Sequence, residues 1–148
     1  MHFEDSVVIE QPAQKVFDYL SNPVNIPEWS GPPIEVRDLQ QSVPGELREG
    51  DKFTVVAKFL GKRLETPSEV TSYEPNRRLS YRSTGGPVPQ DYTFLLEEVP
   101  GGTRLTQSVD AEPGGFFGLI GPVFERVGKR QQRNDLETLK DLLETDNQ

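Results

Sequence analysis

Cysteine is absent from the sequence, and this absence removes several kinds of chemistry at once. Without cysteine there is no disulfide, no thiol nucleophile and no cysteine-based zinc or iron–sulfur site. The single histidine, His2, stands beside the chain end, where we expect fraying and no fixed partner for an imidazole. Ser-His-Asp catalysis and histidine-rich metal sites are therefore excluded, and we expect no metal and no cofactor.

Long apolar stretches are also missing. The longest mostly apolar run, residues 116–124, is about half of what a bilayer span requires. Glu4 and Asp5 stand where a secretory leader would carry Lys or Arg. Together with the lack of cysteine, these features predict a cytoplasmic protein with no stable membrane insertion.

Positive charge is in deficit, because 24 Asp and Glu residues outnumber 16 Lys and Arg residues and the net charge is −8 at pH 7. Nucleic acid requires a basic face, so we expect no nucleic-acid partner. The glycine pairs at 85–86, 101–102 and 114–115 lack the spacing of phosphate-binding loops and are interpreted as turns.

Strand patterns dominate the first three quarters of the chain. Alternating apolar residues, β-branched residues and turn residues predict seven strands, at residues 3–10, 34–42, 51–60, 62–73, 79–84, 90–99 and 103–111. Because the connections are short and sequential, an antiparallel meander is predicted. Two short helices are expected after the first strand, one from Pro12 to the stop at Pro23 and one over residues 25–29.

A long helix is predicted from the glycines at 114–115 to about Thr145. Steps of three and four place one stripe of residues on a single face, namely Phe117, Ile120, Phe124, Gly128, Gln132, Leu136, Leu139 and Leu143. Pro122 is expected to kink this helix or to mark its true start. One amphipathic helix cannot cover seven flat strands, so the sheet must curl around it. The predicted fold class is α+β, a single domain over residues 1–148 with a curved seven-stranded antiparallel sheet wrapped around the C-terminal helix.

Four segments stand in an order that is typical of one superfamily. They are Ile9-Glu10-Gln11-Pro12-Ala13-Gln14-Lys15-Val16-Phe17, Asn22-Pro23-Val24-Asn25-Ile26-Pro27-Glu28-Trp29, Glu74-Pro75-Asn76-Arg77-Arg78-Leu79-Ser80-Tyr81 and Gly101-Gly102-Thr103-Arg104-Leu105-Thr106. In this order the sequence resembles the polyketide cyclase/dehydrase-like branch of the helix-grip (START-like, SRPBCC) superfamily, over nearly the whole chain. The superfamily also includes START domains and plant pathogenesis-related class 10 proteins. The resemblance implies a helix-grip fold, and because these segments are fold markers it implies no catalytic motif.

The inward faces of the predicted strands and of the last helix supply the candidate ligand-binding residues. Large apolar side chains occur there with a few hydroxyls and amides that a plain core would not include, a mixture typical of small-molecule sites. Gly128 interrupts the helical stripe at a cost of about 1 kcal/mol relative to alanine, which either room for a ligand or the close approach of a strand would explain. The resemblance implies that Trp29, the only tryptophan, helps to close the scaffold near the pocket. The candidates are Trp29, Phe53, Val55, Phe59, Thr66, Ser68, Tyr81, Tyr92, Phe94, Gln107, Ile120, Phe124, Gly128 and Gln132.

Carboxylates are numerous, but the sequence pattern assigns none of them to an inward face. Most of them fall on outward strand positions, such as Asp91 and Glu97, or on the polar face of the last helix. Glu65 and Glu69 also point away from the predicted cavity. No catalytic residue is therefore nominated.

Three classes of function follow from these observations. The leading hypothesis is a binding or carrier protein for a hydrophobic or aromatic small molecule, such as a polyketide-, lipid- or quinone-like compound. The second is a polyketide cyclase or dehydratase acting in the same cavity, which a cavity-facing carboxylate with a raised pKa would favour. The third is a protein-interaction module with a packed hollow. The oligomeric state, monomer or homodimer, is left open.

Overall fold

The computed structural model describes residues 1–31, 34–59 and 61–145, and its main feature is one antiparallel sheet. The strands are β1 (His2–Ile9), β2 (Ile34–Gln40), β3 (Lys52–Phe59), β4 (Lys62–Glu74), β5 (Arg78–Ser83), β6 (Gln90–Val99) and β7 (Gly102–Ala111). Their order in the sheet is β1-β7-β6-β5-β4-β3-β2. The predicted meander is thus correct from β2 to β7, while β1 pairs with β7 at the far edge.

Helices precede and follow the meander. Between β1 and β2 lie α1 (Ala13–Leu20), the short 3-10 helix η1 (Pro23–Asn25) and α2 (Ile26–Trp29). After β7 come α3 (Gly115–Leu119) and α4 (Gly121–Thr145). Pro122 is the second residue of α4 and marks its start, because proline is tolerated in the first helical turn, where its missing N–H needs no partner. No helix in the described part of the chain has the length and apolar character to cross a bilayer.

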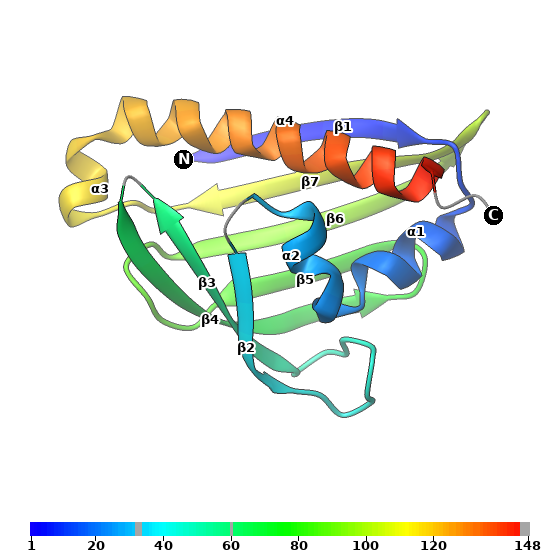
Figure 1. Ribbon diagram of the computed structural model, residues 1–148, viewed down its shortest axis with the longest axis horizontal. Coiled ribbons are helices and arrows are strands. Elements are labelled where there is room, and N and C mark those ends of the chain that lie inside the picture. Colours follow the sequence, from blue (N-terminus) through cyan, green and yellow to red (C-terminus); the bar gives the residue numbers. More distant parts are fainter. Residues whose placement is uncertain (32–33, 60, 146–148) are drawn as a thin grey trace.

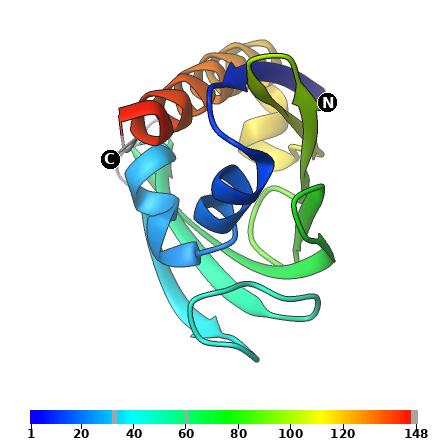
Figure 2. The same ribbon diagram turned by 90° about the vertical axis from the view of Figure 1, so that its right-hand side faces the viewer.

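The sheet curls around α4, as predicted from the inability of one helix to cover seven flat strands (Figure 1). Viewed from the end, β1 and β2 form its two edges, and α4 and α2 lie across the opening between them (Figure 2). Contacts of α4 with β1, of α2 with α4 and of α2 with β2 complete this closure. The arrangement is the predicted α+β helix-grip fold.

The core lies at the C-terminal half of α4, where Leu136, Leu139 and Leu143 are fully or almost fully buried. The amide of Gln11 donates a hydrogen bond of 2.9 Å to the carbonyl oxygen of Leu143 and so ties this end of the helix to the turn after β1. The N-terminal half of α4 is less tightly covered, and it is here that the sheet and the helix separate around a hollow.

Candidate ligand-binding cavity

A cavity of about 320 Å³ lies between the concave face of the sheet and α4. Its volume is at the lower end of the roughly 300–1,000 Å³ range of small-molecule sites. The lining comes from β1, α2, every strand from β2 to β7, and α4, and most of it is apolar or aromatic. Apolar members that the sequence analysis had not selected are Phe3, Ile26, Ile34, Ala57, Leu64, Val88, Val109 and Val127.

Aromatic rings form one wall of the cavity. The rings of Tyr81 on β5 and Tyr92 on β6 are stacked, with centroids 5.1 Å apart. Behind them, the buried ring of Phe53 packs edge-on against Tyr81 at 5.3 Å. The ring of Phe94, also buried, contacts Trp29 edge-on at 5.7 Å and lies 6.3 Å from Tyr81. Phe53 and Phe94 therefore support the lining rings and are not part of the lining themselves.

The polar groups of the lining are few, and several already have partners. The amide nitrogen of Gln132 donates a hydrogen bond of 3.0 Å to the backbone carbonyl of Gln107, which joins α4 to β7. The hydroxyl of Tyr92 donates a bond of 2.5 Å to the side-chain oxygen of Gln90. Thr66 and Ser68 line the cavity from β4, and the hydroxyl of Ser68 donates a hydrogen bond of 3.4 Å to the backbone carbonyl of Thr66. Such fixed polar groups in an apolar hollow can orient a ligand.

Of the fourteen candidates, ten are brought together around the cavity: Trp29, Val55, Thr66, Ser68, Tyr81, Tyr92, Gln107, Phe124, Gly128 and Gln132. Ile120 is placed elsewhere, because it packs with Phe124 against the small cluster of Val88, Ala111 and Phe117. The side chain of Phe59 lies outside the described part of the structure.

The glycine at position 128 is explained by the close approach of the Phe3 side chain of β1 to α4. A Cβ at this position would lie 2.8 Å from Cε2 of Phe3, the aromatic side chain that β1 directs into the cavity. Of the two explanations that the sequence allowed, the approach of a strand is the one that the geometry supports. The absent side chain lets the ring of Phe3 pack flush on α4.

One ionisable group of the cavity is absent from the predicted site residues, because the sequence pattern places no carboxylate clearly on an inward face. Asp135 of α4 lines the cavity and is only 8% exposed. Its Oδ1 accepts a hydrogen bond of 2.7 Å from the amide of Gln131, one turn earlier. The backbone N–H of Gly31 and the hydroxyl of Ser30, both at the end of α2, also donate to this carboxylate.

Burial governs the electrostatics of this group. Desolvation raises the pKa of Asp135 to about 6, and its three hydrogen bonds only partly offset that effect. Burial is also the main reason that the pKa of Tyr81 lies above its ordinary value and that the pKa of Tyr92 is raised to about 12. The negative charge of Asp135 adds to both shifts. Both phenols therefore keep their protons at neutral pH.

A signal for Asp135 was present in the helical spacing. The residue follows Gly128 by seven positions and Gln132 by three, so it belongs to the same face as the stripe. The predicted stripe continues instead through Leu136, four positions after Gln132. In the structure both Asp135 and Leu136 are buried. The side chain of Asp135 is drawn inward by Ser30 and Gly31, which are distant in the sequence.

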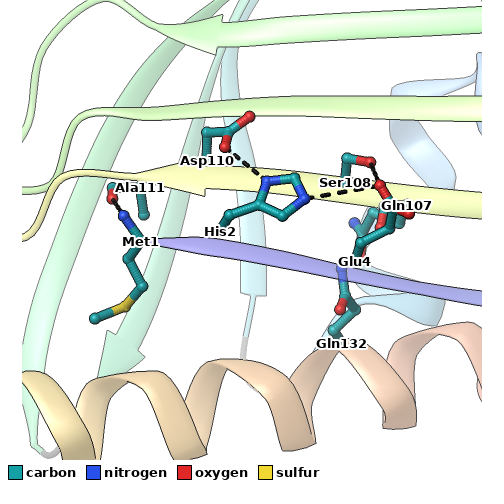
Figure 3. A network of polar contacts seen from close by, with 8 residues as sticks. All are labelled: Met1, His2, Glu4, Gln107, Ser108, Asp110, Ala111 and Gln132. Atoms are coloured by element: carbon teal, nitrogen blue, oxygen red, sulfur yellow. Dashed lines mark hydrogen bonds and ion pairs between the residues drawn. The ribbon is translucent and has the colours of Figure 1, made fainter.

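His2 lies on the outer face of the sheet, and the expected fraying of the chain end is wrong (Figure 3). Its Nδ1 is 2.7 Å from a carboxylate oxygen of Asp110 on β7, and its Nε2 is 3.7 Å from Glu4. The ammonium group of Met1 donates to the carbonyl of Ala111 at 3.0 Å. His2 is thus fixed in place but points away from the cavity. Among the described residues, no cluster of three or more His, Cys, Asp and Glu side chains is arranged to hold a metal.

Comparisons with known proteins agree with this architecture. Residues 1–144 match the model of the family described as "Polyketide cyclase / dehydrase and lipid transport". Among solved structures, a protein from Thermus thermophilus is similar with a TM-score of 0.80 and 18% identity, over 100% of both chains. The Zhui aromatase/cyclase from Streptomyces sp. R1128 is similar with a TM-score of 0.75 and 19% identity, over 97% of this chain and 93% of that one. The structure of Ara h 8.0201 is similar with a TM-score of 0.68 and 15% identity, over 99% of each chain. A search of curated proteins found no significant match.

Proposed function

The chain belongs to the polyketide cyclase/dehydrase and lipid transport family, and from this premise we propose that it binds or carries a hydrophobic or aromatic small molecule in the cavity between the sheet and α4. The ligand class is polyketide-, lipid- or quinone-like. The whole chain acts as one domain in this proposal, and its place of action is the cytoplasm. The observation that carries the proposal is the mostly apolar cavity of about 320 Å³. An interaction module with a packed, closed hollow would not need such a space.

The lining divides into groups with different tasks. Burial of apolar ligand surface against Val55, Phe124 and the aromatic wall supplies the affinity, at roughly 25 cal/mol per Å² before the entropic costs of binding. Orientation comes from the hydroxyls of Thr66 and Ser68 and from the amide of Gln107. Phe53 and Phe94 act indirectly in this scheme, because they hold the lining rings in place.

The test is to fill the cavity from one side and to compare the result with a matched control. Val55 lines the cavity from β3, whereas its neighbour Thr54 points to the opposite side of the strand. We expect Val55→Phe to weaken the binding of a naphthalene-based probe by about tenfold or more, measured by titration calorimetry, and Thr54→Phe to leave it within about threefold. Native mass spectrometry of the purified protein adds a search for a co-purified ligand.

Two results would contradict the binding proposal. The first is equal weakening by both substitutions, which would place the probe outside the cavity. The second is the absence of binding by aromatic and acyl probes combined with a protein that purifies without any small molecule. A thermal melt of each variant verifies that it is folded.

A second function, catalysis of cyclisation or dehydration, is favoured by Asp135. A carboxylate with its pKa raised to about 6 inside an apolar cavity is suited to proton abstraction near neutral pH. The ionised carboxylate would take a proton from a carbon flanked by two carbonyl groups, and the enolate so formed would attack a third carbonyl carbon of the same chain. The resulting alkoxide would take up the proton that Asp135 had removed. The hydroxyl would later leave as water together with a hydrogen of the neighbouring carbon, and a carbon–carbon double bond would form. The protonated phenol of Tyr81, which belongs to the same lining, would donate a hydrogen bond to an enolate oxygen, whereas the phenol of Tyr92 already donates to Gln90.

This second function is tested by deuterium uptake from D₂O into the central carbon of an aromatic 1,3-diketone. The enzymatic proposal expects uptake by the native protein that rises with pH through an apparent pKa near 6, and no catalysed uptake by Asp135→Asn. Uptake that is the same in both proteins would remove Asp135 from the role of base.

A further inference from the structure

The cavity has an unusual charge composition. Of its described lining residues, only Lys58 and Asp135 carry a charge. Lys58 is solvent-exposed on β3, where water screens it, whereas Asp135 is buried under α4 and the end of α2. The inner part of the site therefore presents one negative charge among apolar and aromatic groups.

Every partner of the Asp135 carboxylate is uncharged. The donors are the amide of Gln131, the hydroxyl of Ser30 and the backbone N–H of Gly31. No ion pair within 4.0 Å joins Asp135 to a Lys or Arg of the described residues. A buried carboxylate without a positive partner is costly, and a cation that enters the cavity would compensate that cost.

The surroundings of the carboxylate also favour a cation. The stacked rings of Tyr81 and Tyr92 and the indole of Trp29 belong to the same lining, and their faces attract positive charge. Asp135 lines the same cavity as Tyr81 and Tyr92, so a cation in that space would face both the carboxylate and the aromatic wall. The net charge of −8 attracts cations to the protein and repels anions.

We infer that the ligand of this cavity is a hydrophobic organic cation, an aromatic or apolar body with a protonated amine that pairs with the Asp135 carboxylate. The inference rests on the proposed binding function and narrows its ligand class. It has a negative counterpart: apolar carboxylates, such as free fatty acids entering with the carboxylate first, are rejected by the same charge.

The test uses three probes that share one ring system and differ in charge. These are 2-naphthylmethylamine, 2-naphthylmethanol and 2-naphthoate, titrated by calorimetry at about pH 7.5 into the native protein and into Asp135→Asn. We expect the amine to bind the native protein about tenfold tighter than the alcohol, and the naphthoate to bind weakest. In Asp135→Asn the advantage of the amine disappears while the alcohol binds within about threefold of its native affinity.

Asp141→Asn is the matched control, because it removes the same charge from an exposed position of α4. This variant should keep the preference for the amine, which separates the local effect of Asp135 from the overall charge. If the alcohol and the naphthoate bind the native protein as tightly as the amine, the inference is wrong and the binding function stands. If no probe binds and the protein purifies without any small molecule, the proposed function itself fails.

A second measurement on the native protein does not depend on the folding of a variant. The affinity for the amine should fall as the pH is lowered from about 7.5 to about 5, because Asp135 becomes protonated, and the affinity for the alcohol should not fall. The other titratable groups that face this space are Tyr81 from β5, Tyr92 from β6 and Lys58 from β3. Burial raises the pKa values of both tyrosines, so their phenols keep their protons in that range. A pH-independent preference for the amine would overturn the inference.

Discussion

Asp135 makes the stability of the protein depend on pH in an unusual direction. Its pKa is about 6 in the folded protein, compared with the ordinary value of 3.8 for this side chain. Because the folded value is the higher one, the contribution of this group is fully present below about pH 3.8 and is lost as the pH rises through 6. Ionised Asp135 therefore destabilises the fold at neutral pH, whereas most carboxylates of folded proteins stabilise it there.

The size of the effect follows from the two pKa values. A difference of about two units corresponds to about 3 kcal/mol of unfolding free energy over the full range of titration. Between about pH 7.5 and about pH 5 the share of this group is about 1.4 kcal/mol. The substitution that tests this effect is Asp135→Asn. It removes the titrating group but keeps a side-chain oxygen that can accept a hydrogen bond from Gln131 or Gly31.

The assay is urea unfolding of both proteins at several pH values, followed by circular dichroism. The native protein should gain about 1–2 kcal/mol relative to Asp135→Asn as the pH falls from about 7.5 to about 5, since all other groups titrate in both proteins. Asp141→Asn serves as the control and should run parallel to the native protein. Parallel curves for the native protein and Asp135→Asn would refute the argument that the carboxylate is buried without a charged partner.

Packing in the helix-grip core yields two further predictions, both measured by urea unfolding. Gly128→Ala should destabilise the fold by about 1–2 kcal/mol, because its Cβ would lie 2.8 Å from the Phe3 ring, and Phe3→Leu in the same chain should recover part of the loss. A gain in stability would mean that the helix propensity of alanine outweighs the contact. Leu136→Ala, at a position with 0% exposure, should cost about 2–5 kcal/mol, while Leu119→Ala, at 86% exposure, should stay within about 0.5 kcal/mol.

Local sequence patterns were sufficient to predict most of the fold. The strand at residues 90–99 was predicted with the bounds that β6 has, because alternation and the flanking turns are properties of neighbouring residues. The break of the last helix near Pro122 was also visible, since proline fits only the first turn of a helix. Pairing of β1 with β7 was not visible, because no local pattern records which distant strand lies beside an edge.

For the candidate site, too, local patterns predicted one part and the tertiary structure decided the other. Alternation indicated which side chains point inward, so Val55, Tyr92 and Gln107 were found without any knowledge of their neighbours. Alternation did not distinguish the residues that line the hollow from those behind them, and Phe94 is an example. That distinction depends on how far the opposite wall stands from each residue, which is a property of the closed structure.

The amino-acid pattern alone was sufficient for the elements, their curvature around one helix and the mixed lining of the inward face, because each of these follows from short-range periodicity and from the need to cover apolar surface. Tertiary contacts were needed for the electrostatic character of the cavity. Asp135 is a buried, hydrogen-bonded carboxylate because Ser30 and Gly31 at the end of α2 meet α4 at that turn. Gly31 permits this approach, since a Cβ there would lie 1.9 Å from the amide nitrogen of Gln131. The burial of a charge depends on segments that are far apart in the chain, and no local period encodes it.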